Sequence, residues 1–149
     1  MEDVLTVHTD GGARGNPGPA AIGVVIEKKG KLVYQFGKNI GDTTNNVAEY
    51  TAVIEALNKI LELEIMNKEL RMNFFLDSKL VVEQLNGRFK IKDMKLRELS
   101  LKIKILEQEV CGSLPAGRKV ITYTAIPREK NIQADLLVNQ ALDELENRR

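Results

Sequence analysis

Four carboxylates stand where strands and helices can direct them into one cleft. Asp10 and Asp77 each follow a run of apolar or β-branched residues, and ligand sites in open α/β sheets form beyond the carboxyl ends of strands. Glu49 and Asp135 lie at the start of helical patterns, on rows that carry apolar residues. A turn or the helix dipole explains any one of these acids as well as function does. The group of four favours a shared chemical role.

Clustered carboxylates raise one another's pKa unless a cation compensates their charge. The chain has one cysteine, Cys111, and one histidine, His8, so a metal ion must be held by oxygen atoms. Such clusters suit Mg²⁺ or Mn²⁺ and commonly hold two ions about 3.5 to 4 Å apart, which promote phosphoryl displacement. We therefore predict metal-dependent phosphodiester chemistry. His8, two residues before Asp10 on the same strand face, is interpreted as a packed, hydrogen-bonded core histidine.

The elements that position these acids follow from hydrophobic periodicity. Apolar and β-branched runs predict strands over residues 4–9, 21–27, 32–38, 71–76 and 120–125. Apolar residues at three- and four-residue steps predict helices over about 46–61, 78–85, 94–110 and 131–146. A loop is expected over the Gly- and Pro-rich residues 10–20. Asn46 is the expected N-cap of the first helix, with Glu49 three residues on, as in a capping box.

This order of elements predicts an α/β fold. Three strands in succession form an antiparallel meander, and helices join the last two strands so that they lie parallel to the first. The result is a mixed five-stranded sheet, three antiparallel strands and then two parallel ones, with helices on both faces. The 149 residues show no linker or repeat, so residues 1–149 are expected to form one domain.

Composition excludes several classes of protein. The net charge of +1 is neither that of an acidic tail nor that of a strongly basic nucleic-acid coat. No apolar run reaches the roughly 18 to 20 residues that cross a bilayer, and the first residues lack a signal-peptide pattern. We expect a cytoplasmic protein without membrane contacts.

Four sequence blocks resemble the signature blocks of the type 1 ribonuclease H family. Each block contains one of the acids, and the blocks follow the family's order: residues 9–19 (TDGGARGNPGP), 43–50 (TTNNVAEY), 76–81 (LDSKLV) and 127–135 (PREKNIQAD). The match spans nearly the whole chain. It implies the ribonuclease H-like fold and an endonuclease that cleaves the RNA strand of RNA/DNA hybrids and leaves 3′-hydroxyl and 5′-phosphate ends. We expect the protein to be a monomer.

The resemblance also implies a role for each acid. Asp10 would bridge two Mg²⁺ or Mn²⁺ ions, with Asp77 and Glu49 completing one metal site and Asp135 the other. Water would be the nucleophile. Glu49 would also touch the 2′-hydroxyl group beside the scissile phosphate.

Substrate contacts are expected in the first two blocks. Only the 2′-hydroxyl group distinguishes RNA from DNA at a given sugar, so its recognition requires nearby backbone groups or short amides. Gly11 and Gly12 allow close approach of the backbone, while Asn16 and Asn45 match family positions that read the minor groove of the hybrid. Thr44 matches a position that binds a phosphate of the DNA strand. The alternative is that these residues only build turns and helix caps.

The chain departs from many bacterial members in two places. The loop before Asp135 has no histidine and resembles the archaeal-type branch, where an arginine stands instead, and Arg128 is the candidate. An arginine stays protonated, so it would stabilise charge or assist release of the product. The chain also has no tryptophan and no clear basic protrusion, although residues 88–104 carry seven Lys and Arg against two acids.

Two other functions remain open on the sequence alone. Cleavage of double-stranded RNA is one, because its minor groove also displays 2′-hydroxyl groups. A non-catalytic hybrid-binding protein is the other. Loss of an acid is the usual mark of such proteins, and all four acids are present here.

Overall fold

The computed structural model describes residues 4–63, 71–112 and 121–148. The strands are β1 (Val4–Ala13), β2 (Gly18–Lys28), β3 (Lys31–Thr43), β4 (Arg71–Leu76) and β5 (Ile121–Ala125). The helices are α1 (Asn45–Glu62), α2 (Lys79–Leu85), α3 (Met94–Cys111), the short 3-10 helix η1 (Arg128–Lys130) and α4 (Ile132–Asn147). The predicted start of the last strand at Val120 lies outside the described residues. None of the described helices is both long and apolar enough to cross a bilayer.

The five strands form one mixed sheet in the order β3-β2-β1-β4-β5. β2 pairs antiparallel with both β1 and β3, while β4 pairs parallel with β1 and with β5. The two-residue turn between β2 and β3 has positive φ angles of 52° at Lys29 and 76° at Gly30, as tight hairpins require. The predicted sheet, with three antiparallel and two parallel strands, is confirmed.

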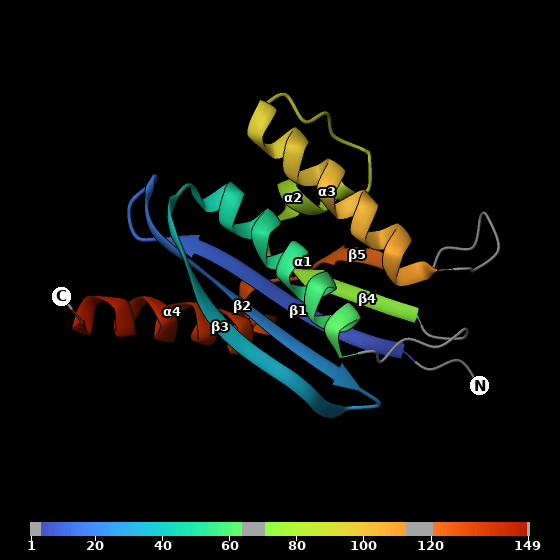
Figure 1. The fold of residues 1–149 in the computed structure, drawn as a ribbon, viewed down its shortest axis with the longest axis horizontal. Coiled ribbons are helices and arrows are strands. Elements are labelled where there is room, and N and C mark those ends of the chain that lie inside the picture. Colours follow the sequence, from blue (N-terminus) through green and yellow to red (C-terminus); the bar gives the residue numbers. More distant parts are fainter. Residues whose placement is uncertain (1–3, 64–70, 113–120, 149) are drawn as a thin grey trace.

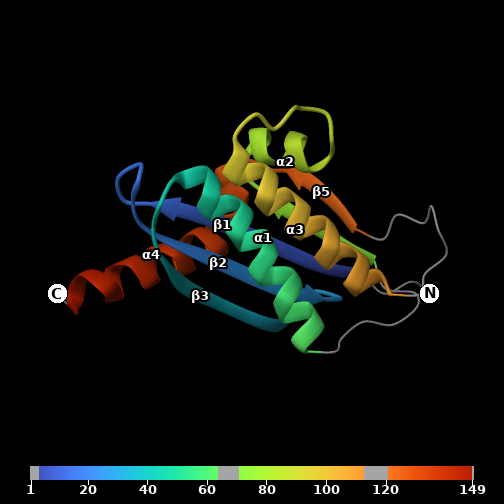
Figure 2. The ribbon, with the colours of Figure 1, turned by 45° about the horizontal axis from the view of Figure 1, so that its top comes forward.

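Helices cover both faces of the sheet, as predicted. α1, α2 and α3 lie on one face, and α4 crosses the other (Figures 1 and 2). Glycines allow α4 to approach the strands closely: a Cβ on Gly23 would lie 2.2 Å from the Ala134 carbonyl oxygen, and one on Gly37 would lie 2.5 Å from that of Leu137. The main core fills the space between the sheet and α1 and α3, where Tyr50, Leu57 and Phe74 are fully buried.

Two local predictions are wrong. β1 does not end before Asp10, because residues 10–13 stay paired with β2 as far as Ala13 opposite Ala20. Gly12 and Ala13 pair with Ala21 and Ala20 of β2. The glycine-rich segment therefore continues the antiparallel pair of strands and does not form a loop. The N-cap of α1 is Thr44 and not Asn46, since the Thr44 hydroxyl accepts a hydrogen bond from the Val47 N–H at 3.2 Å. Glu49 forms no capping box and is directed elsewhere.

Candidate active site

Three of the four acids meet at the centre of the sheet. Asp10, Glu49 and Asp77 each offer a carboxylate oxygen, and these oxygens all lie within 4.8 Å of one another. The parallel pairing of β1 and β4 ends at His8 opposite Phe75. Asp10 and Asp77 each come two residues after this last pair, so they lie beside each other, Asp10 on β1 and Asp77 directly after β4. The sheet order therefore decides this contact between two residues that are distant in sequence.

Glu49 reaches the strands because Gly11 has no side chain. A Cβ on Gly11 would lie 2.3 Å from the carbonyl carbon and oxygen of Ala48 in α1, closer than real Cβ atoms come. The first turn of α1 can therefore press against β1, and the Gly11 backbone N–H donates a hydrogen bond to the Glu49 carboxylate. The side chain of Glu49 is 7% exposed and continues the buried row of Val53 and Ile60.

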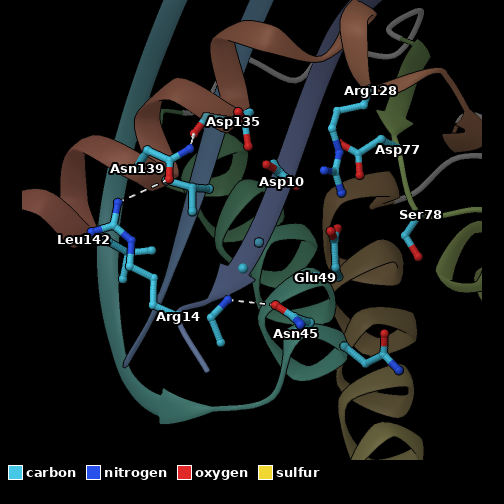
Figure 3. A pocket seen from close by; sticks show the side chains of 15 residues that line it. Asp10, Arg14, Asn45, Glu49, Asp77, Ser78, Arg128, Asp135, Asn139 and Leu142 are labelled. Atoms are coloured by element: carbon cyan, nitrogen blue, oxygen red, sulfur yellow. Dashed lines mark hydrogen bonds between the residues drawn. The ribbon is translucent and has the colours of Figure 1, made fainter. Parts of the chain in front are cut away.

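Asp135 lines the same cleft from the opposite side. The cleft, here called the acidic cleft, has a volume of about 440 Å³, and its walls come from β1, α1, α4 and the segments that follow β4 and β5. Figure 3 shows Asp10 between Asp135 on α4 and Asp77 at the end of β4. Asp135 lies outside the group of three oxygens described above. The structure thus places all four predicted acids in one cleft, three of them with carboxylate oxygens within 4.8 Å of one another.

The electrostatics of the cleft favour a bound cation. Burial, together with the negative charges of Asp77 and Asp135, raises the pKa of Asp10 to about 7. Burial and the charges of Asp10 and Asp77 raise the pKa of Glu49 well above its usual range. The Oε2 atom of Glu49 is buried and has no hydrogen-bond partner among the described residues. A compact set of carboxylate oxygens with one unpartnered member matches the ligands that Mg²⁺ and Mn²⁺ prefer.

Comparisons with known proteins agree with this geometry. The RNase H family model matches residues 2–143. The chain belongs to the RNase H family. It is 39% identical over 138 residues to ribonuclease HI of Halobacterium salinarum, covering 92% of this chain and 63% of that protein. It is 36% identical over 141 residues to the bifunctional protein Rv2228c of Mycobacterium tuberculosis, covering 93% of this chain but only 35% of that protein.

Solved RNase H structures share the fold over nearly the whole chain. LC11-RNase H1 in complex with an RNA/DNA hybrid has a TM-score of 0.85 and 40% identity, and the match covers 95% of this chain and 98% of that one. RNase H1 from the halophilic archaeon Halobacterium salinarum has a TM-score of 0.83 and 34% identity, with the same coverage. The family resemblance drawn from the four sequence blocks is confirmed.

In this RNase H chain, the three polar residues predicted to bind substrate lie side by side next to the acidic cleft. The Asn16 side-chain oxygen accepts a hydrogen bond from the Asn45 N–H at 3.0 Å, and the Asn45 side-chain oxygen accepts one from the Ala13 N–H at 2.8 Å. They also line a second hollow of about 590 Å³ together with Thr44, whose hydroxyl caps α1. These residues therefore have structural roles, and their substrate contacts stay predictions.

The two glycines predicted to bind substrate differ in their surroundings. The Cα of Gly11 faces α1, so this glycine serves the close packing of strand and helix. Gly12 lies in the wall of the acidic cleft, where an added Cβ would meet only Val138 at 3.8 Å and the Asn45 side-chain oxygen at 4.0 Å. Gly12 is thus the position where a substrate backbone has room to approach.

Arg128 lines the acidic cleft, as its predicted role requires. It is the first residue of η1, directly after Pro127. Figure 3 shows its side chain on the Asp77 side of the cleft, pointing toward the carboxylates. Its contribution to catalysis stays a prediction.

Sequence reasoning missed Arg14, which forms the rim of the cleft. Its guanidinium lies 2.7 Å from carboxylate oxygens of both Asp143 and Glu146 and 3.3 Å from the Asn139 side-chain oxygen, so it joins the β1–β2 hairpin to α4. Arg14 lies within the first sequence block, but its partners are more than 120 residues away.

The interpretation of His8 is partly upheld: it is half-buried and stacked on Phe75, with 5.2 Å between ring centroids, but no hydrogen bond to it is found among the described residues.

Proposed function

We propose that this chain is an endoribonuclease that cleaves the RNA strand of RNA/DNA hybrids with the help of divalent cations. The observation that carries the proposal is the contact of Asp10, Glu49 and Asp77, whose carboxylate oxygens lie within 4.8 Å, with Asp135 in the same cleft. The likeness to LC11-RNase H1, which was solved with an RNA/DNA hybrid, supports the choice of substrate.

The four acids divide into two sets around Asp10. Asp77 and Glu49 lie on one side of it and Asp135 on the other, so Asp10 is the residue that can serve two cation sites at once. Two Mg²⁺ or Mn²⁺ ions, when bound, would activate a water molecule and neutralise charge on the leaving oxygen. The products would carry 3′-hydroxyl and 5′-phosphate ends. The Arg128 guanidinium, which stays protonated, would hold charge on the product phosphate.

The rim of the cleft would recognise the hybrid. The backbone at Gly11 and Gly12 and the amides of Asn16 and Asn45 offer the donors and acceptors that a 2′-hydroxyl group requires. Thr44 would bind a phosphate of the DNA strand at the hollow beside the start of α1. Glu49 would contact the 2′-hydroxyl group next to the scissile phosphate.

The decisive experiment is cleavage of a hybrid whose RNA strand carries an end label, with Mg²⁺ or Mn²⁺, with a chelator, and with Asp10→Asn in parallel. We expect cleavage that requires both the metal ion and Asp10, since the substitution removes the central ligand while keeping the shape of the side chain. Retained turnover by Asp10→Asn in Mg²⁺ would refute the bridging role. Binding of the hybrid without any cleavage by the wild type would establish a non-catalytic hybrid-binding protein instead.

Double-stranded RNA is the substrate to compare with the hybrid. Measured at matched salt, a strict hybrid nuclease cleaves the hybrid much faster than duplex RNA of the same sequence. Equal rates would show a broader nuclease. The single-domain, monomeric and cytoplasmic character expected from the sequence also stays a prediction, and sedimentation of the purified protein tests the monomer.

A further inference from the structure

Asn131 is a buried polar residue directly behind the acidic cleft. It lies between η1 and α4 and is 1% exposed. Its backbone starts α4, because the Asp135 N–H donates to the Asn131 carbonyl at 3.1 Å, yet its side chain makes no capping hydrogen bond. Asparagine is favoured at this position because its side chain caps the helix. Here the side-chain amide is directed to other partners.

The amide of Asn131 joins the segments that carry the acids. Its Nδ2 atom donates to the Thr9 carbonyl at 2.9 Å and to Oδ2 of Asp77 at 3.1 Å. Thr9 directly precedes Asp10, and Asp135 follows on the first turn of the helix that Asn131 begins. One amide group thus connects the ends of β1 and β4 with the start of α4.

Both contacts of the amide require the same orientation. Thr9 offers a carbonyl oxygen and Asp77 a carboxylate oxygen, so the group that faces them must be the NH₂ donor. The Oδ1 atom of Asn131 is then turned away, and it is buried without a partner among the described residues. Asn131 also lines a cavity of about 180 Å³ on the α4 side of the sheet, together with His8 and Glu27.

The contact restrains the Asp77 carboxylate. Within the part of the chain that the structure describes, no other hydrogen bond reaches the Asp77 side chain. The bond holds Oδ2, while Oδ1 accepts no hydrogen bond from the described residues. Carboxylates that bind metals are commonly oriented by a hydrogen bond of this kind. The Oδ1 atom of the buried amide has no partner among the described residues, so this orientation carries a desolvation cost that a fully satisfied amide would not.

We propose that Asn131 is a positioning residue that orients Asp77 for a divalent cation held jointly with Asp10 and Glu49. The inference rests on the proposed function, because it takes Asp77 to be a metal ligand. Asn131 itself does not touch the reacting atoms and acts only through Asp77 and the ends of β1 and α4.

The test compares the same substitution at two asparagines. Asn131→Ser keeps a residue that caps helices well, but its side chain is too short to reach Asp77. Asn39 on β3 is the matched control: its Nδ2 atom donates to the Ala141 carbonyl in α4 at 3.0 Å, and its Oδ1 atom is also buried without a partner. Asn39→Ser therefore removes a similar bond between the sheet and α4, far from the acids.

Binding of Mn²⁺ to the folded proteins, measured by titration calorimetry without nucleic acid, is the main readout. We expect Asn131→Ser to weaken Mn²⁺ binding about 10- to 100-fold. The kcat for hybrid cleavage should fall by a similar factor at fixed metal concentration, with KM for the hybrid nearly unchanged. Asn39→Ser should leave the Mn²⁺ affinity within about twofold of wild type, even where its thermal stability falls equally.

A Mn²⁺ affinity of Asn131→Ser within twofold of wild type, or reduced only as much as in Asn39→Ser, overturns the proposal. If the serine variant does not fold, Asn131→Leu replaces it, because an apolar side chain of similar shape fills the site and removes both bonds together with the buried Oδ1 atom that has no partner among the described residues. The same titration separates this inference from the proposed function. A wild type that binds Mn²⁺ but does not cut hybrids refutes the activity, while weaker Mn²⁺ binding by the variant still establishes the positioning role.

Discussion

Asp10 occupies the centre of the acidic cluster, between Asp77 and Asp135 (Figure 3). Its pKa of about 7, raised by burial and by Asp77, means that the folded protein holds this proton more tightly than the unfolded chain does. The contribution of Asp10 to stability is therefore fully present below the unfolded pKa of 3.8 and is lost as the pH rises through about 7. In the metal-free protein, the ionised form of Asp10 that the proposed reaction requires opposes folding.

Asp10→Asn should accordingly stabilise the metal-free protein at pH 8. Removal of the ionisation penalty is expected to give about 1 to 3 kcal/mol, and each kcal/mol raises Tm by about 2 to 4 °C in a chain of this size. Thermal unfolding with a chelator at pH 8 and at pH 4 tests this, because the gain should disappear at pH 4. Asp42→Asn, at an exposed position on β3, should leave Tm unchanged. An unchanged or lower Tm for Asp10→Asn at pH 8 contradicts the effect.

Arg128 contributes a fixed positive charge beside Asp77. Arg128→Ala should lower kcat for hybrid cleavage about tenfold, equal to 1.4 kcal/mol of transition-state stabilisation. Arg128→Lys should retain most of the rate, because a lysine also carries a positive charge. Steady-state kinetics of both variants provide the measurement. Equal losses in the two variants would show that guanidinium geometry, and not charge alone, is required.

The contact between β1 and α1 is the element-level feature on which the site depends. Gly11 allows the first turn of α1 to lie against the strand, and this contact places Glu49 beside Asp10. The atoms that a Cβ on Gly11 would meet belong to the backbone of Ala48, so a side-chain rotation cannot relieve the clash. α1 would have to move away from the sheet.

Gly11→Ala should therefore destabilise the fold by about 1 to 3 kcal/mol or more and weaken metal binding, since Glu49 moves with α1. Gly12→Ala is the matched control for stability, because its Cβ would meet atoms only at 3.8 Å and beyond. Chemical denaturation of both variants measures the difference. If Gly11→Ala unfolds at the same denaturant concentration as Gly12→Ala, the close approach of strand and helix is not what positions Glu49.

Metal binding at the proposed site would be linked to folding across the whole molecule. The acids come from β1, α1, α4 and the residue that directly follows β4, so a cation that binds them would join elements from both faces of the sheet. A ligand that binds only the folded state stabilises it, by about 2.7 kcal/mol at 100 times its Kd. Protons compete for the same carboxylates, since the pKa values of Asp10 and Glu49 are raised.

Saturating Mg²⁺ should thus raise Tm more at pH 8 than at pH 5.5. At the lower pH, Asp10 and Glu49 hold protons that must leave before a cation binds. Unfolding scans with and without Mg²⁺ at the two pH values provide the measurement, and Asp10→Asn should show a much smaller shift. A Mg²⁺ shift that is independent of pH would indicate a cation site away from these two carboxylates.

Much of this molecule was predictable from local patterns. β4 was predicted at its observed bounds of Arg71–Leu76, because a short apolar run between turn signals has few alternatives. The errors occurred where tertiary contacts outweigh local signals. Glycines normally break strands, yet residues 11–13 remain in β1 because they pair in register with Ile22, Ala21 and Ala20 of β2. Asn46 has the right type for a helix cap, but the hairpin that binds Asn45 leaves Thr44 at the cap position.

Residue types and spacing by themselves determined the family, the strand and helix order, and the four acids, because these depend on local periodicity and on short motifs. Only the tertiary structure decided which acids lie close together, that Gly11 allows α1 to pack against β1, and that the amide of Asn131 faces Asp77. One such contact, between Asn131 and Thr9, joins residues 122 positions apart. Such contacts arise when the sheet order and the packing of the helices are complete, since no local pattern specifies the direction of a side chain in space.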